Sequence, residues 1–165
     1  MTEQIQLPDL STQKDYAGTA FSPIYTTTVT VSGGVASHGR ASGRARSSDG
    51  ALDISLRMPA ELGGDGRATN PEQLFAAGFA ACFHGVLSLV ARQEELDPAP
   101  ISVDATVAFG RDPEDGGYLL RADLVVNWPD MDPEIATPLL DQADSLCPYA
   151  RMAWHGTPTT ITLAP

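Results

Sequence analysis

Two residues of this chain could carry redox chemistry, Cys82 and Cys147, which are its only cysteines. A thiolate can attack the distal oxygen of a peroxide, which releases an alcohol and leaves a sulfenic acid on the sulfur. A second thiol can then condense with the sulfenic acid to a disulfide and protect the first sulfur from further oxidation. The pair fits such a two-step cycle, whereas a cysteine in either setting, taken alone, is more often a packing residue of a core.

The neighbours of both cysteines bear on this choice. Cys82 lies in AAGFAACFHG, where Gly78 and Gly85 leave room for a substrate beside the sulfur. Cys147 lies in SLCPYAR, where Pro148 is expected to end a helix and fix the direction of the chain. Neither setting by itself separates a reactive cysteine from a structural one.

A reactive thiolate needs a nearby positive charge that lowers the pKa of the thiol. Arg40, Arg44 and Arg46 lie in or beside a Gly/Ser-rich loop and could supply that charge. Glu72 is the candidate carboxylate that would hold such an arginine by a bidentate pair. Because Glu72 and Cys82 lie about 15 Å apart along a straight helix, either the helix breaks or Glu72 serves a second subunit.

A metal site is the competing arrangement, because Cys82, His84, Cys147 and His155 offer two thiols and two imidazoles. Side chains two residues apart on a helix point in nearly opposite directions, which disfavours one ion shared by Cys82 and His84. The sequence also contains neither CxxC nor HExxH. We therefore expect no bound metal or cofactor.

Composition limits the partners. The chain of 165 residues is 42% hydrophobic and 19% charged, as in ordinary soluble domains. A net charge of −11 disfavours binding to nucleic acid or to anionic membranes. The N-terminus lacks the basic and apolar segments of a secretory signal, so a cytoplasmic protein is expected. The weakly polar run over residues 74–91 has the length of a membrane span, and a helix buried in protein explains it better.

The elements that position these residues follow from hydrophobic patterning. Residues 1–24 lack clear periodicity and are expected to be an N-terminal extension, whereas residues 25–165 should form one domain. The expected order within that domain is a strand over 25–31, a hairpin over 44–58 with SSDG at its turn, a long helix over 71–95, a hairpin over 103–128, a helix over 132–146 that Pro138 would kink or break, and a strand over 159–163. This order predicts an α+β fold.

The long helix has a clear beginning. Asn70 suits the N-cap, Pro71 the first helical position, and Gln73 can complete a capping box. Residues 74–90 are apolar nearly all round, so the helix should be central and covered on more than one side.

Four segments together resemble the organic hydroperoxide resistance proteins, the Ohr branch of the OsmC/Ohr family. They are TNPEQLFAAGFAACFHG (69–85), CPYA (147–150), SSDGALD (47–53) and PAELGG (59–64). The resemblance covers about residues 25–163. It implies antiparallel sheets around a long buried central helix in an intertwined homodimer, with active sites at the interface.

The resemblance also implies a lipoyl-dependent peroxidase that acts on alkyl and fatty-acid hydroperoxides. Cys82 matches the peroxidatic cysteine, Cys147 the resolving cysteine, and Glu72 the carboxylate that holds the catalytic arginine. Dihydrolipoamide on lipoylated proteins would re-reduce the disulfide. A carboxylate supplied by the other subunit would explain the separation of Glu72 from Cys82.

The sequence departs from the family pattern at two places. The segment GGVASHGRASGRARSSDG contains inserted residues, so that Arg40 is the best match for the catalytic arginine and Arg44 the fallback. RMAWHG after CPYA differs from the usual Ser-Asn-Ala-Thr, which bears on substrate preference.

The alternative function is a non-catalytic relative that binds small hydrophobic ligands or senses redox state. Arginine placement discriminates the two, and an OsmC-type peroxidase would use the same chemistry on other substrates.

Overall fold

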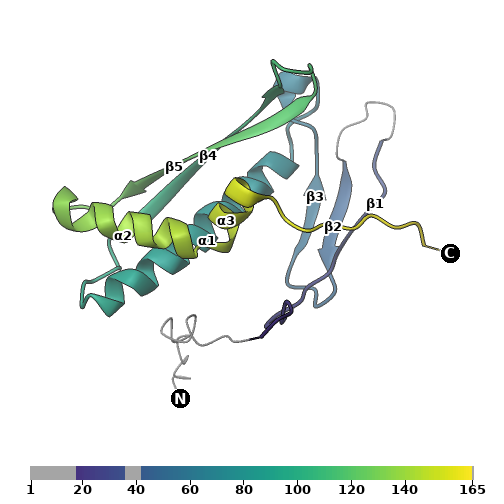
Figure 1. The fold of residues 1–165 in the computed structure, drawn as a ribbon. Helices are drawn as coiled ribbons and strands as arrows, with labels where there is room; N and C mark the ends of the chain where they lie inside the picture. The colour runs from purple at the N-terminus through teal and green to yellow at the C-terminus, as the bar shows by residue number, and fades with distance from the viewer. Residues whose placement is uncertain (1–17, 36–41, 165) are drawn as a thin grey trace.

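The computed structural model describes residues 18–35 and 42–164. Two antiparallel sheets and three α-helices form an α+β fold around one long helix (Figure 1). In chain order the elements are β1 (Val29–Ser32), β2 (Gly43–Ser47), β3 (Asp53–Leu56), a 3₁₀ turn (Ala60–Leu62), α1 (Pro71–Gln93), β4 (Ser102–Arg111), β5 (Tyr118–Asn127), α2 (Pro133–Leu146) and α3 (Pro148–His155). The predicted fold class and the long central helix are confirmed.

The two sheets are built from the two predicted hairpins. Strands β1, β2 and β3 form a three-stranded sheet in that order, and SSDG lies at the turn between β2 and β3. Strands β4 and β5 pair from end to end as a two-stranded sheet. Alternate residues of β4 face inward, as the period of two in the sequence predicts.

Helix α1 begins with the predicted capping box. The Asn70 side chain accepts the backbone N–H of Gln73 at 2.9 Å, and the Gln73 side chain accepts the backbone N–H of Asn70 at 3.3 Å. Pro71 occupies the first turn, where a missing N–H costs nothing. The helix then runs for 23 residues without a break and ends at Gln93. It is the one helix in the described parts of the chain with the length and apolar character of a membrane span.

The core lies where α1 meets β4, α2 and α3. The residues of α1 buried there are Phe79, Phe83, Leu87, Val90 and Ala91. A different face of α1, which carries Ala77, Ala81 and Gly85, is exposed in the single chain. Within the single chain α1 is therefore covered on its core side, while the expectation of cover on a further side is not met.

Two expected strands differ from the structure. The first is β1, which begins at Val29 instead of residue 25. The second is the segment 159–163, which forms no strand, and Ile161 and Leu163 there are 96% and 97% exposed. A strand exists only if its backbone groups pair with a neighbour, and no strand of the described chain pairs with this segment.

The region around the second cysteine also differs. Pro138 neither breaks nor ends α2, whose residues Leu139 and Ala143 are anchored in the core. Pro148 was expected only to end a helix, but it is also the first residue of α3. Proline suits that position because its fixed φ is already helical and its missing N–H would have had no partner there.

Candidate active site

The fold brings the two cysteine sulfurs into contact. Cys82 lies in the middle of α1, whereas Cys147 is the single residue that joins α2 to α3. The two Sγ atoms are 3.5 Å apart, and both cysteines are free thiols. A disulfide requires a separation of about 2.05 Å, so an approach of roughly 1.5 Å would close the bond.

The joint between α2 and α3 fixes Cys147 from both sides. Its backbone N–H donates to the carbonyl of Ala143 in α2, at 2.8 Å, and its own carbonyl accepts the N–H of Arg151 in α3, at 3.0 Å. The Cys147 side chain is completely buried, whereas that of Cys82 is only partly buried. Of the two cysteines, only Cys82 therefore has exposed surface in the single chain.

The surroundings of Cys82 within one chain favour the protonated thiol. Burial raises the pKa of Cys82, while the backbone N–H of Tyr149 donates to its sulfur and opposes this effect. The neighbouring Cys147 sulfur is a further cause of the higher pKa, because a second negative charge beside Cys82 would disfavour its thiolate. Among the described residues no cationic side chain contributes to the pKa of Cys82. In the single chain, the described residues thus supply no positive charge that would activate this thiol.

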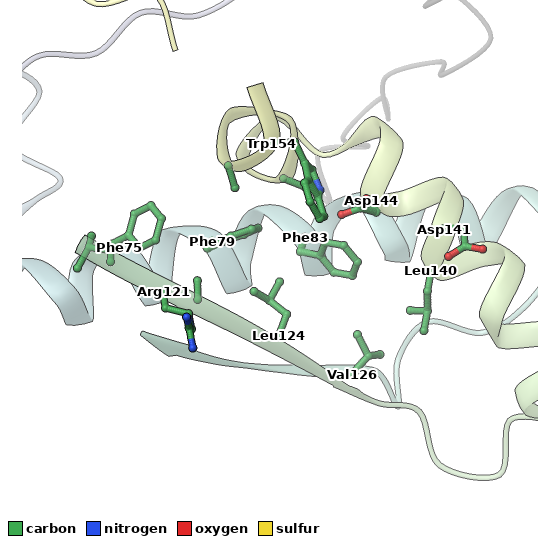
Figure 2. A pocket seen from close by; sticks show the side chains of 14 residues that line it. Phe75, Phe79, Phe83, Arg121, Leu124, Val126, Leu140, Asp141, Asp144 and Trp154 are labelled. Carbon is green, nitrogen blue, oxygen red and sulfur yellow. The ribbon is translucent and has the colours of Figure 1, made fainter. Parts of the chain in front are cut away.

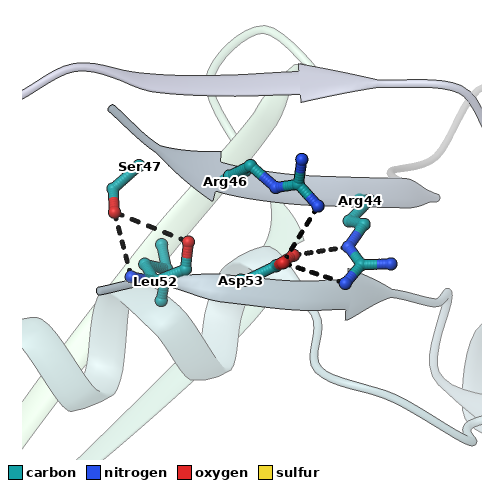
Figure 3. Close-up of polar contacts among 5 residues, drawn as sticks. All are labelled: Arg44, Arg46, Ser47, Leu52 and Asp53. Atoms are coloured by element: carbon teal, nitrogen blue, oxygen red, sulfur yellow. Dashed lines mark hydrogen bonds and ion pairs between the residues drawn. The ribbon is translucent and has the colours of Figure 1, made fainter. Parts of the chain in front are cut away.

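The arginines of β2 are engaged elsewhere. Arg44 and Arg46 both contact the carboxylate of Asp53 on the neighbouring strand β3 (Figure 3). The Nη2 atoms of the two arginines lie 2.9 and 3.0 Å from Asp53 Oδ2, and Arg44 adds a bond from Nε. Hydrogen bonds from the two guanidinium groups lower the pKa of Asp53 to about 2. Arg40, predicted to be the catalytic arginine, lies outside the described residues.

Glu72 lies in the first turn of α1 and is partly buried. Because α1 is unbroken from Glu72 to Cys82, the two backbones are separated by about 15 Å of helix. One of the two explanations offered for this separation, a break in the helix, is therefore wrong. A direct role for this carboxylate at Cys82 then requires a second copy of the chain.

The histidine nearest Cys82 in the sequence serves the fold. His84 Nε2 is 3.1 Å from the carbonyl oxygen of Ile101, to which it can donate. This bond ties α1 to the beginning of β4. In the described part of the chain, no three His, Cys, Asp or Glu side chains gather as a metal site would require.

A cavity of about 700 Å³ with mainly apolar walls lies between α1, β5, α2 and α3 (Figure 2). Its walls include Phe79 and Phe83 of α1, Leu124 of β5 and Ala150 of α3, with Trp154 over it. Neither sulfur lines the cavity. Trp154 belongs to RMAWHG, the segment in which the sequence departs from the family pattern.

Comparison with known proteins decides the family. The family model of OsmC-like proteins matches residues 64–162. The organic hydroperoxide resistance protein of Xanthomonas axonopodis pv. citri is 43% identical over 143 residues, which cover 86% of this chain and 95% of the relative. The chain belongs to the organic hydroperoxide resistance branch of the OsmC-like family. The prediction made from residues 69–85 and 147–150 is confirmed.

Solved structures of the same branch share the fold. That of the organic hydroperoxide resistance protein OhrB of Bacillus subtilis is 40% identical and matches with a TM-score of 0.67, over 81% of this chain and 93% of that one. The organic hydroperoxide resistance protein of Elizabethkingia anophelis is 36% identical and matches with a TM-score of 0.72, over 82% and 92%.

One contributor to the site of this Ohr-branch chain was missed from the sequence. It is the backbone N–H of Tyr149, the second residue of α3, which donates to Cys82 Sγ. A signal for it was present, because proline at the first position of a helix predicts free N–H groups immediately after it. The same proline also predicts the end of the preceding helix, and that interpretation alone does not reveal the donor.

Proposed function

We propose that this protein reduces organic hydroperoxides to alcohols, with Cys82 as the attacking thiolate and Cys147 as the resolving thiol. The observation that carries the proposal is the 3.5 Å contact between two free thiols, one accessible and one buried, in a chain of this family. The names of its relatives support an organic hydroperoxide as the class of substrate.

The proposed cycle has three balanced steps. Cys82 Sγ⁻ attacks the distal peroxide oxygen, the O–O bond breaks, and the alkoxide leaves and takes up a proton, so that Cys82 becomes a sulfenic acid. Cys147 Sγ then attacks the sulfur of the sulfenic acid, a disulfide forms and water leaves. An external dithiol finally returns two electrons and two protons and restores both thiols. Dihydrolipoamide on lipoylated proteins is the proposed dithiol, and no bound cofactor takes part.

Arg40 and Glu72 complete the proposed site. Arg40 would lower the pKa of Cys82, which burial raises, and could hydrogen-bond the peroxide oxygen. Glu72 would hold the guanidinium of Arg40 in a bidentate pair. Since α1 separates Glu72 from Cys82, we propose that the carboxylate comes from a second copy of the chain.

A homodimer would also cover what the single chain exposes. The small residues Ala77, Ala81 and Gly85 of α1 offer a flat surface next to Cys82. Ile161 and Leu163 are almost fully exposed on a segment whose alternating pattern suits a strand that pairs with another chain. We propose an intertwined dimer in the cytoplasm, with sites at its interface and without nucleic-acid or membrane partners.

The first test is turnover with a defined reductant. Purified protein should reduce cumene hydroperoxide when dihydrolipoamide is regenerated by its reductase, and NADH consumption would report the rate. Glutathione in place of dihydrolipoamide should support little turnover, because the proposed reductant of the Cys82–Cys147 disulfide is a dithiol and glutathione has a single thiol. An absence of thiol oxidation with every organic hydroperoxide tried would refute the proposed function.

Composite sites predict complementation between two inactive variants. Glu72→Gln and Cys82→Ser should each be nearly inactive alone, whereas chains unfolded and refolded together should recover activity in mixed dimers. When equal amounts of the two variants pair at random, half of the dimers are mixed. Each mixed dimer carries one intact site of two, so about a quarter of the wild-type rate is expected. Recovery no greater than the sum of the separate variants would place both residues of a site in one chain.

A second function has one observation in its favour. Within the described residues burial raises the pKa of Cys82, and the chain contains a mainly apolar cavity between α1, β5, α2 and α3. These two features suit a non-catalytic protein that binds small hydrophobic ligands or senses redox state. Such a protein would bind an apolar ligand with Cys82 and Cys147 both replaced by serine, and would show no catalytic turnover as wild type.

A further inference from the structure

Gly78 lies beneath the ring of Tyr149, one turn before Cys82 on α1. A Cβ atom at Gly78 would lie 3.1 Å from the Tyr149 hydroxyl oxygen and 3.4 Å from two carbons of its ring. The backbone of Gly78 is not in the left-handed region, so the helix itself does not need a glycine at this position. Because glycine weakens a helix interior relative to alanine, the space that it leaves for the ring is the physical reason for its presence.

The ring and the backbone of Tyr149 dock on two successive turns of α1. The ring contacts Gly78 and packs near Phe75 and Phe79, with centroid separations of 6.4 and 5.9 Å. The backbone N–H donates to the sulfur of Cys82, which lies on the same face one turn further along. The ring therefore sets how closely the beginning of α3 approaches α1.

Cys147 moves with this docking point. It is two residues before Tyr149 and caps the same helix, and its sulfur is 3.5 Å from that of Cys82. A displacement of the ring by a few tenths of an ångström would move the beginning of α3, and the Cys147 sulfur with it. Disulfide geometry tolerates little error, so such a shift would disfavour the bond.

We propose that Gly78 is a positioning residue, which seats the Tyr149 ring and so sets the equilibrium between the Cys82–Cys147 dithiol and its disulfide. The inference rests on the proposed function, in which this pair cycles between the two states. In the half-reaction each thiol loses a proton, one S–S bond forms, and two electrons pass to a small disulfide, which becomes two thiols.

Equilibration of Gly78→Ala with defined ratios of reduced and oxidised dithiothreitol tests the proposal. Free thiols are trapped by alkylation and counted by mass spectrometry. We expect the equilibrium constant for the intramolecular disulfide to fall about tenfold, which raises the reduction potential by about 30 mV. A value within twofold of wild type would overturn the proposal.

A compensating variant distinguishes an effect of the Gly78–Tyr149 contact from a general loss of structure. Tyr149→Phe removes the oxygen that lies closest to the added Cβ and leaves ring carbons at 3.4 Å, an ordinary contact. The double variant Gly78→Ala/Tyr149→Phe should therefore return to within about threefold of the equilibrium of Tyr149→Phe alone. If the double variant stays as shifted as Gly78→Ala, the inferred contact is wrong.

Two further variants make the result specific. Gly110→Ala, near the end of β4, adds a methyl group where nothing lies within 4 Å, and should keep the wild-type equilibrium. An equal shift in Gly110→Ala would overturn the inference. Tyr149→Ala deletes the ring while it leaves Gly78 in place, so it provides a test even if Gly78→Ala does not fold, and it should lower the constant as well. Failure of the wild type to form the disulfide would count against the proposed function instead.

Discussion

Cys82→Ser is expected to abolish hydroperoxide reduction, with a loss of about 10⁴-fold or more, because removal of a covalent nucleophile leaves no other route to the product. Cys82 is the one sulfur of the pair that a peroxide can reach, since Cys147 is 0% exposed. A coupled assay with cumene hydroperoxide and dihydrolipoamide measures the loss. A residual rate above a hundredth of wild type would mean that another group attacks the peroxide.

Cys147→Ser is the matched control for that experiment. The substitution is close to isosteric and removes the resolving thiol, so the protein should consume about one equivalent of hydroperoxide and stop. A sulfenic acid on Cys82 should then accumulate and appear as an adduct with dimedone in mass spectrometry. Sustained turnover by Cys147→Ser with dihydrolipoamide would show that the external thiol resolves the sulfenic acid directly.

Arg40→Ala is expected to lower kcat/KM by roughly 10²–10³-fold, the usual loss when one preorganised electrostatic donor is removed. Burial raises the pKa of Cys82, and the charge of Arg40 is proposed to lower it. Without Arg40 the thiolate should form only at higher pH. The midpoint of the pH profile for Cys82 alkylation by iodoacetamide, measured with Cys147→Ser present in both proteins, should therefore move upward.

Arg44→Ala is the control that distinguishes the two arginines. Arg44 is held by Asp53 on β3, so its loss should leave the alkylation profile of Cys82 near that of wild type. A larger effect of Arg44→Ala than of Arg40→Ala would assign the catalytic charge to Arg44 and contradict the match to the family pattern that favours Arg40.

Local signals predicted the frame of the site well. The capping box of Asn70 and Gln73 is a short-range device, and it forms as expected at the beginning of α1. The two hairpins follow from alternation and turn residues, which also act over short distances. The exposed segment 159–163 shows the limit, because a strand needs a neighbour and the sequence of one chain does not say where that neighbour lies.

The contact between the cysteines could not be predicted from spacing. Cys82 and Cys147 are 65 residues apart, and their approach depends on how α3 packs against α1. The resemblance to Ohr proteins supplied the pairing instead. It could not supply the seat of Tyr149 on Gly78, because that contact depends on ring orientation and on the unexpected start of α3 at Pro148.

The unequal burial of the two cysteines determines which sulfur the reductant attacks when the proposed disulfide is reduced. An incoming dithiol can collide only with the sulfur that has open surface, which is Cys82. The transient mixed disulfide between protein and reductant should thus form on α1, and Cys147 should depart as the leaving group into the core. Cys147 would then be the nucleophile when the disulfide forms and the leaving group when it is reduced, while substrate and reductant use the same entrance in turn.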